Sequence, residues 1–198
     1  MNILVILAHP QKGSFNHAIA EASVNTLNQL GHKVVFHDLY AEGFNPVIEA
    51  EEISPKAKLY PSLKKYCDAI KAADGIVIVH PNWWGQPPAI LKGWIDRVFK
   101  AKIVYRFEEK DKGERIPIGL LKAEKAIIFN TSNTKEDREM ETFGDPLETL
   151  WKKCIFGLCG VKNVERRMFT VIITSTKQQR EAWLEEVKSI IAKQFPRL

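Results

Sequence analysis

Residues 75–99, GIVIVHPNWWGQPPAILKGWIDRVF, contain a strand pattern, a loop pattern and a helix pattern in direct succession. Residues 75–80 form a mostly apolar, β-branched run, which is typical of a parallel strand covered on both faces. Prolines and a glycine interrupt the chain at 81–88, and apolar residues at helical spacing follow from Pro88 to Phe99. This order predicts a strand that leads through a loop into a helix, which is half of a parallel β-α-β unit.

The same alternation extends outward along the whole chain. Further strands are predicted at residues 2–8, 33–38, 125–130 and 167–174, and further helices at 15–30, 56–73, 146–158 and 177–194. No linker and no internal repeat divides the sequence. We therefore expect residues 1–198 to form a single α/β domain with three layers, in which a five-stranded parallel sheet carries helices on both faces. The long connections 41–55 and 101–122 have the length of binding loops.

Composition excludes several classes of protein. The chain has 45% hydrophobic and 27% charged residues, ordinary for a soluble globular protein, and no apolar run of the roughly 18–20 residues that a membrane span needs. The first residues lack a basic signal-peptide region, so we expect a cytoplasmic protein. The net charge is 29 − 24 = +5, but basic and acidic residues are interleaved, which argues against nucleic-acid binding. Three cysteines without a CxxC pair argue against disulfides and a zinc site, and Cys154 and Cys159 are expected to be buried.

Polar and aromatic residues follow three of the predicted strands, at the edge where parallel sheets bind ligands. The turn 9–16, HPQKGSFN, places hydroxyl, amide and cationic side chains beside the free N–H groups of a helix start, which favours a phosphate. The alternative is that Ser14 is only a helix cap. No GxGxxG and no GxxxxGK[ST] motif occurs, which disfavours a dinucleotide-type turn and a P-loop.

The other two turns carry flat and polar groups. Trp83 and Trp84 in a Pro- and Gly-rich loop offer a wall for a planar ligand, or alternatively plug the core under the loop. Residues 130–134, NTSNT, offer small polar side chains, or alternatively form a turn with local hydrogen bonds. Taken together, the three turns predict a pocket for a phosphorylated, flat, aromatic cofactor such as flavin mononucleotide (FMN).

Three stretches, AHPQKGSFNHAI at 8–19, DLYAEGFNP at 38–46 and PNWWGQPPAILKGWIDRVF at 81–99, carry a family resemblance. The chain resembles, over residues from about 1 to 164, the flavodoxin-like NAD(P)H:quinone oxidoreductases, which include DT-diaphorase and the ancillary flavoproteins of potassium-efflux systems. The resemblance implies a flavodoxin-like fold and a homodimer. It also implies two-electron hydride transfer from NAD(P)H through a bound flavin to a quinone or similar acceptor, in alternating ping-pong steps.

The resemblance also implies site residues. The expected cofactor-binding residues are His9, Ser14, Phe15, Asn16, Pro81, Asn82, Trp83, Trp84, Gly85, Thr131, Ser132 and Asn133. Tyr105 and Phe107 match aromatic residues that reach the partner subunit's site in the family. The family also places a Tyr and a His before a Gly-Asp pair, where they balance charge on the reduced flavin. Here Phe143 precedes that pair and 135–141 has neither, so we expect backbone N–H groups and the side chains of 131–133 to take this role, with Arg138 or Lys135 as the cationic alternative. The expected catalytic residues are Thr131, Arg138 and Tyr105.

Several alternatives stay open at this point. FMN is preferred to FAD because the sequence ends at Leu198, soon after the last predicted helix. NAD(P)H is the expected co-substrate, and no metal is expected. The protein could instead be a regulatory flavoprotein subunit peripherally attached to a membrane potassium-efflux transporter. A flavodoxin-type electron carrier is the weaker alternative, because such carriers are usually strongly acidic and this chain carries +5.

Overall fold

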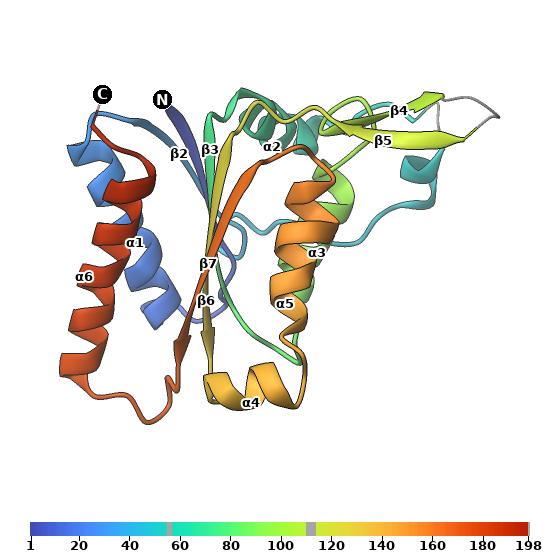
Figure 1. Cartoon of the computed structure of the whole chain (residues 1–198). Helices are drawn as coiled ribbons and strands as arrows, with labels where there is room; N and C mark the ends of the chain where they lie inside the picture. Colours follow the sequence, from blue (N-terminus) through green and yellow to red (C-terminus); the bar gives the residue numbers. More distant parts are fainter. Residues whose placement is uncertain (55–56, 110–113, 198) are drawn as a thin grey trace.

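The structure is a computed structural model that describes residues 1–54, 57–109 and 114–197. Five strands form one sheet and a separate hairpin projects from it (Figure 1). The strands are β1 (Asn2–Leu7), β2 (Lys33–Asp38), β3 (Gly75–Pro81), β4 (Tyr105–Glu109), β5 (Arg115–Gly119), β6 (Lys125–Ser132) and β7 (Asn163–Thr170). The helices are α1 (Phe15–Gln29), the 3-10 helix η1 (Ala50–Ile53), α2 (Pro61–Ala72), α3 (Ala89–Val98), α4 (Glu136–Glu141), α5 (Pro146–Thr149), its π-helical continuation η3 (Leu150–Gly157), and α6 (Lys177–Gln194).

The main sheet is parallel, with the strand order β2-β1-β3-β6-β7. Helices α1 and α6 cover one face, and α2, α3 and α5 cover the other (Figure 1). Because successive side chains of a strand point to opposite faces, Ile3, Val5 and Leu7 pack in the core under α1 and α6, and Leu4 and Ile6 pack in the opposite core. The predicted three-layer fold is confirmed.

The order of the strands determines where a ligand can bind. The chain runs from β1 to its neighbour β2 on one side and then to β3 on the other side. The loops after β1 and β3 therefore diverge, and a crevice opens between them at the carboxyl ends of the strands.

The GWIDRV segment of α3 fixes the long connection after β2. Gly93 is required there, because a Cβ atom at this position would lie 2.3 Å from the carbonyl oxygen of Pro46. Arg97 donates to the backbone oxygen of Asn45 at 2.7 Å and forms a buried ion pair with Glu52 at 2.7 Å. Asn45, Pro46 and Glu52 of this connection are thus held against α3.

Four predictions about the elements were wrong or incomplete. The last strand spans Asn163–Thr170 and not 167–174, because it pairs with the whole of β6 from Lys125 to Ser132. The connection 101–122 contains the hairpin of β4 and β5. The predicted helix 56–73 is α2, which begins at Pro61, and residue 56 lies outside the described residues. Cys154 is exposed, whereas Cys159 is buried as expected.

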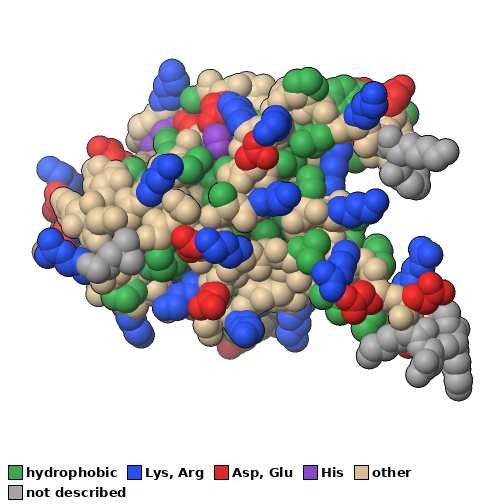
Figure 2. Space-filling model, turned by 90° about the horizontal axis from the view of Figure 1, so that it is seen from above, with side chains coloured by type: hydrophobic (Ala, Val, Ile, Leu, Met, Phe, Trp, Pro, Cys, Tyr) green, Lys and Arg blue, Asp and Glu red, His purple; other side chains and the backbone are tan. Residues whose placement is uncertain are grey.

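Charged side chains are spread over the face that contains the amino ends of the strands. Figure 2 shows Lys and Arg side chains among Asp and Glu side chains there, and a hollow between two projections of the molecule. This view agrees with the interleaved charges of the sequence. Among the helices described, none combines the length and the apolar character needed to cross a membrane.

Candidate functional site

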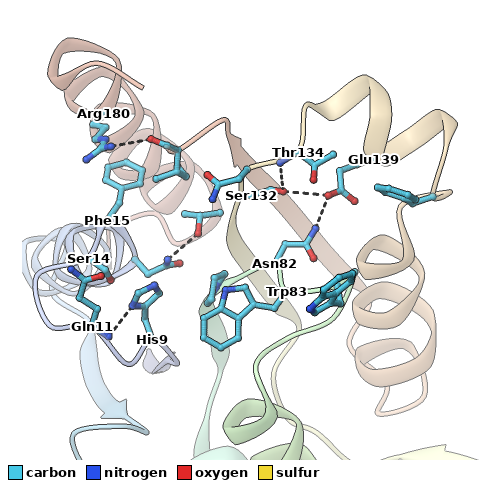
Figure 3. A pocket seen from close by; sticks show the side chains of 18 of the residues that line it. His9, Gln11, Ser14, Phe15, Asn82, Trp83, Ser132, Thr134, Glu139 and Arg180 are labelled. Atoms are coloured by element: carbon cyan, nitrogen blue, oxygen red, sulfur yellow. Dashed lines mark hydrogen bonds between the residues drawn. The ribbon is translucent and has the colours of Figure 1, made fainter. Parts of the chain in front are cut away.

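A cavity of about 770 Å³ opens at the crevice between the loops after β1 and β3 (Figure 3). Its walls include all twelve residues that the sequence predicts for cofactor binding, so three segments far apart in the chain meet there. The volume lies within the range of cofactor and small-molecule sites, which is roughly 300–1,000 Å³. The remaining lining residues are Gln11, Gly13, Thr134, Glu139, Phe143, Pro146, Ile172 and Arg180.

One end of the cavity has the chemistry of an anion site. Gly13 adopts a left-handed conformation with φ of +73°, which turns the chain into α1. Ser14 is the N-cap residue, and its Oγ accepts from the N–H of His17 at 3.4 Å. Within the described hydrogen bonds, the N–H groups of Phe15 and Asn16 have no backbone acceptor. Both donors therefore remain available to an anion at the positive end of the helix dipole.

Arg180 of α6 adds a cation near this end, above Phe15 in Figure 3. Its guanidinium is held by the hydroxyl of Ser175 at 2.7 Å and the backbone oxygen of Ile172 at 2.9 Å. Sequence analysis missed Arg180, because nothing in the spacing of α6 shows that one of its basic residues reaches the carboxyl edge of the sheet.

A tight turn forms the aromatic wall. Trp83 and Gln86 exchange two backbone hydrogen bonds of 3.0 Å, and the two central residues, Trp84 and Gly85, have φ of +57° and +70°. Two positive φ angles define a type I′ turn. A side chain at Gly85 would meet Pro146 at 2.7 Å. The Trp84 side chain is fully exposed at the rim, so it does not plug the core.

Thr131 joins the three walls of the cavity. Its Oγ1 accepts from Nδ2 of Asn16 at 2.9 Å, and its carbonyl oxygen accepts from the N–H of Asn82 at 2.6 Å. The side-chain oxygens of Asn16 and Asn82 are buried without a hydrogen-bond partner among the residues that the structure describes. Unused acceptors of this kind are expected where a ligand completes the hydrogen bonding.

Asn133 and Ser132 have partners within the protein. Oδ1 of Asn133 accepts from the N–H of Ile173 at 3.0 Å, and Oγ of Ser132 accepts from the N–H of Thr134 at 3.0 Å. The local turn that we considered as an alternative is therefore present, although both residues also line the cavity.

Glu139 of α4 is the residue of the cavity wall that sequence analysis most clearly missed. It is 4% exposed and accepts hydrogen bonds from Nδ2 of Asn82 at 2.9 Å and Oγ of Ser132 at 3.2 Å (Figure 3). In the sequence, Glu139 lies within the mostly charged segment KEDREME, which is typical of a solvent-exposed helix. Only the packing of α4 over the end of β6 distinguishes Glu139 from its neighbours.

Two histidines near the cavity are held neutral. Burial lowers the pKa of His9, whose Nδ1 accepts from the N–H of Gln11 at 3.1 Å, so its Nε2 is a donor in the neutral form. Burial lowers the pKa of His80 to about 4. His80 lies within 2.8 Å of the Pro81 carbonyl through Nδ1, and its Nε2 accepts from Trp151 at 3.0 Å. It thereby fixes the backbone at the start of the aromatic turn.

Two of the three predicted catalytic residues are not in the cavity wall. The guanidinium of Arg138 lies over the ring of Phe143 at 5.7 Å; Phe143 lines the cavity, whereas Arg138 itself does not. Tyr105 lines a second, smaller hollow of about 260 Å³ together with Phe107 and Leu158. Thr131 is the only one of the three that the described structure places in the large cavity.

The arrangement suits a flavin mononucleotide. A phosphate matches the free N–H groups of α1 and the nearby cation, and a flat ring matches the tryptophan wall. The N–H groups of Trp84 and Gly85 have no acceptor among the described backbone hydrogen bonds, so they can bind the polar edge of such a ring.

Comparison with known proteins points in the same direction. A family model described as "Flavodoxin-like fold" matches residues 1–192. An uncharacterized NAD(P)H oxidoreductase of Haemophilus influenzae is 34% identical over 192 residues, which cover 93% of this chain and 91% of that protein. An FMN-dependent NADH:quinone oxidoreductase of Pelagibacter ubique is 29% identical over 164 residues, with 78% of this chain and 81% of that protein covered. The crystal structure of Smu.1420 from Streptococcus mutans UA159 superposes with a TM-score of 0.84 at 32% identity, covering 98% of this chain and 100% of that one.

Proposed function

Because the chain belongs to the family with the flavodoxin-like fold, we propose that it is a flavin-dependent NAD(P)H:quinone oxidoreductase with FMN as its cofactor. The observation that carries the proposal is the cavity at the strand switch point, which combines an anion-binding helix start with a tryptophan wall. The names of the Haemophilus and Pelagibacter relatives support NAD(P)H as the electron donor and quinone as the acceptor.

The chain's own residues bind and orient the reactants. The N–H groups of Phe15 and Asn16 hold the phosphate, with Arg180 as counter-charge. Trp83 and Trp84 hold the flat ring, and the hydroxyl of Thr131 can donate to its polar edge because its oxygen already accepts from Asn16. The bound flavin accepts and returns two electrons as hydride. The overall reaction is NAD(P)H + quinone + H⁺ → NAD(P)⁺ + hydroquinone.

Identification of the chromophore tests this proposal. Purified protein should be yellow, and heat should release one FMN per chain. Ser14→Asp should weaken FMN binding by at least tenfold, because it puts a negative charge beside the phosphate, whereas Glu21→Gln on the exposed side of α1 should not. A protein that stays colourless after incubation with FMN and FAD, with no binding by titration, overturns the proposal.

We also propose a homodimer, in which each subunit supplies Tyr105 and Phe107 to its partner's cavity. Helix α3 does not support the dimer, because its apolar residues Trp94 and Val98 are fully buried within the chain. The support is the second hollow and Phe107, which is 54% exposed. Phe107→Asp should convert a dimer into a monomer by analytical ultracentrifugation. A monomeric wild type at about 10 µM contradicts this proposal.

A cytoplasmic location is expected from the sequence, whereas association with a potassium-efflux transporter rests on the family resemblance alone. Copurification with a membrane transporter from the native host would support the association with a transporter. The electron-carrier alternative predicts that NAD(P)H cannot reduce the protein without a separate reductase.

A further inference from the structure

Glu139 lies at the opposite end of the cavity from Arg180 (Figure 3). Oε1 of Glu139 accepts both hydrogen bonds, from Asn82 and from Ser132. Within the described part of the chain, Oε2 has no hydrogen-bond donor, and no cationic nitrogen lies within 4.0 Å of the carboxylate. Glu139 is 4% exposed, and its Oε2 is not among the side-chain atoms that are fully buried without a partner, so this oxygen is accessible on the cavity wall.

The nearby arginines are engaged elsewhere. Arg138 lies over the Phe143 ring, Arg166 forms ion pairs with Asp145 and Glu148, and Arg180 binds the 172–175 turn. Burying a carboxylate without a cation costs free energy, and the two neutral donors offset only part of it. A carboxylate kept in this state on a cavity wall fits a group whose remaining donor arrives with the ligand.

The two ends of the cavity therefore carry opposite charges. Its Arg180 end attracts the anionic end of a ligand, and its Glu139 end attracts N–H donors and repels negative charge. We propose that Glu139 binds the N–H edge of the flavin ring and, through its charge, lowers the reduction potential of the bound flavin. This inference rests on the proposed function, because it needs a flavin in the cavity.

The role is opposite in sign to the one expected of Arg138. A cation beside the ring would stabilise the electron-rich reduced flavin, whereas a carboxylate destabilises it relative to the oxidised form. Reduced flavin bound in this protein is then a stronger reductant. Formation of the reduced flavin beside a negative charge also favours uptake of the proton that the overall reaction consumes.

Glu139→Gln tests the proposal, because the amide keeps the shape and an acceptor for Asn82 and Ser132 but removes the charge. We expect the ratio of reduced to oxidised FMN affinity to rise at least tenfold, which raises the two-electron midpoint potential by about 30 mV. The potential is measured by equilibration with a reference dye, and the affinity of the apoprotein for oxidised FMN by fluorescence titration. Glu141→Gln, an exposed charge on the same helix, is the matched control and should leave the potential unchanged.

A second variant separates charge from a structural role. Ser132→Ala removes one donor to Glu139 but keeps the carboxylate, so the potential should fall or stay constant. If Ser132→Ala raises the potential, or if folded Glu139→Gln leaves it unchanged or lower, the proposal is overturned. Should Glu139→Gln not fold, Ser132→Ala decides alone. Wild type that binds no flavin would instead overturn the proposed function.

Discussion

Thr131 connects the three loops of the cavity, and its hydroxyl is the strongest candidate donor to the ring. We expect Thr131→Val to slow reduction of the bound flavin by NAD(P)H about 100-fold, as for the loss of one donor from a dry site. Arg138→Ala should slow it about threefold or less, because this side chain is exposed, packs on the ring of Phe143 and is not itself part of the cavity lining. Stopped-flow absorbance measures both rates with flavin still bound.

Thr131→Ser is the matched control, because it keeps the hydroxyl and loses only a methyl group. Its rate should stay within about threefold of the wild type. If Arg138→Ala is slower than Thr131→Val, a side-chain cation meets the developing charge, and the assignment to Thr131 is wrong.

His80 should make stability depend on pH. Its folded pKa of about 4 lies below the ordinary value of 6.5, so between these values the unfolded chain binds a proton that the folded chain does not. The free energy of unfolding therefore falls as pH drops through this window, by about 3 kcal/mol in total from this group. In urea titrations, the stability difference between wild type and His80→Gln should narrow from pH 7 to pH 4.5. An equal difference at both values would show that His80 does not titrate in this way.

Among the residues of the cavity, the sequence predicts those that directly follow a predicted strand. His9, Asn82 and Thr131 could be assigned together because the carboxyl ends of parallel strands share one edge. Glu139 and Arg180 could not, because each lies on a helix whose rotation over the sheet depends on packing. Arg138 and Glu139 are adjacent in sequence, yet only the second faces the cavity.

Among the elements, β7 has a buried ion network that holds the turn before α5. Arg166 bonds Glu148 at 2.9 Å and Asn130 at 2.7 Å, and it also pairs with Asp145. Asp145 precedes Pro146, which packs against Gly85. The network therefore supports the aromatic turn from behind.

Arg166→Met should lower the free energy of unfolding by about 3–5 kcal/mol, because it leaves the buried carboxylate of Asp145 unpaired, whereas Glu148 keeps its pair with Lys152. Arg167→Met, the next residue on the same strand, loses a partly exposed pair with Glu186 and a contact with Phe169, so about 1–2 kcal/mol is expected. Chemical denaturation of both variants measures the difference. Equal losses would mean that the Arg166 network contributes no more than a surface pair.

Sequence periodicity predicted some elements with their observed bounds, among them the short strand β2. The helix at 177–194 was predicted with its observed bounds, because Thr176 caps it and its pattern is uninterrupted. The start of β7 was missed because Glu165 and Arg166 look exposed in sequence, whereas Arg166 is paired in the interior. The hairpin β4–β5 was missed because its strands are only five residues long, β4 is mostly charged and β5 contains a proline.

For the molecule as a whole, the sheet order explains why one edge carries the chemistry. The parallel strands bring helix starts and polar turns to their carboxyl ends, and the amino ends carry dispersed charges of both signs (Figure 2). The fold and its ligand-binding edge follow from strand order, whereas the polarity of the cavity follows from single residues at its two ends.

An anaerobic titration tests the central claim most directly. Purified protein with bound FMN is titrated with NADH or NADPH, with no other reductase present, and a quinone is then added. One equivalent of NADH or NADPH per chain should bleach the absorbance of the bound flavin. One equivalent of quinone should then restore this absorbance, with release of hydroquinone. A flavin that stays oxidised with both nucleotides, or that once reduced does not pass electrons to any quinone, would contradict the account.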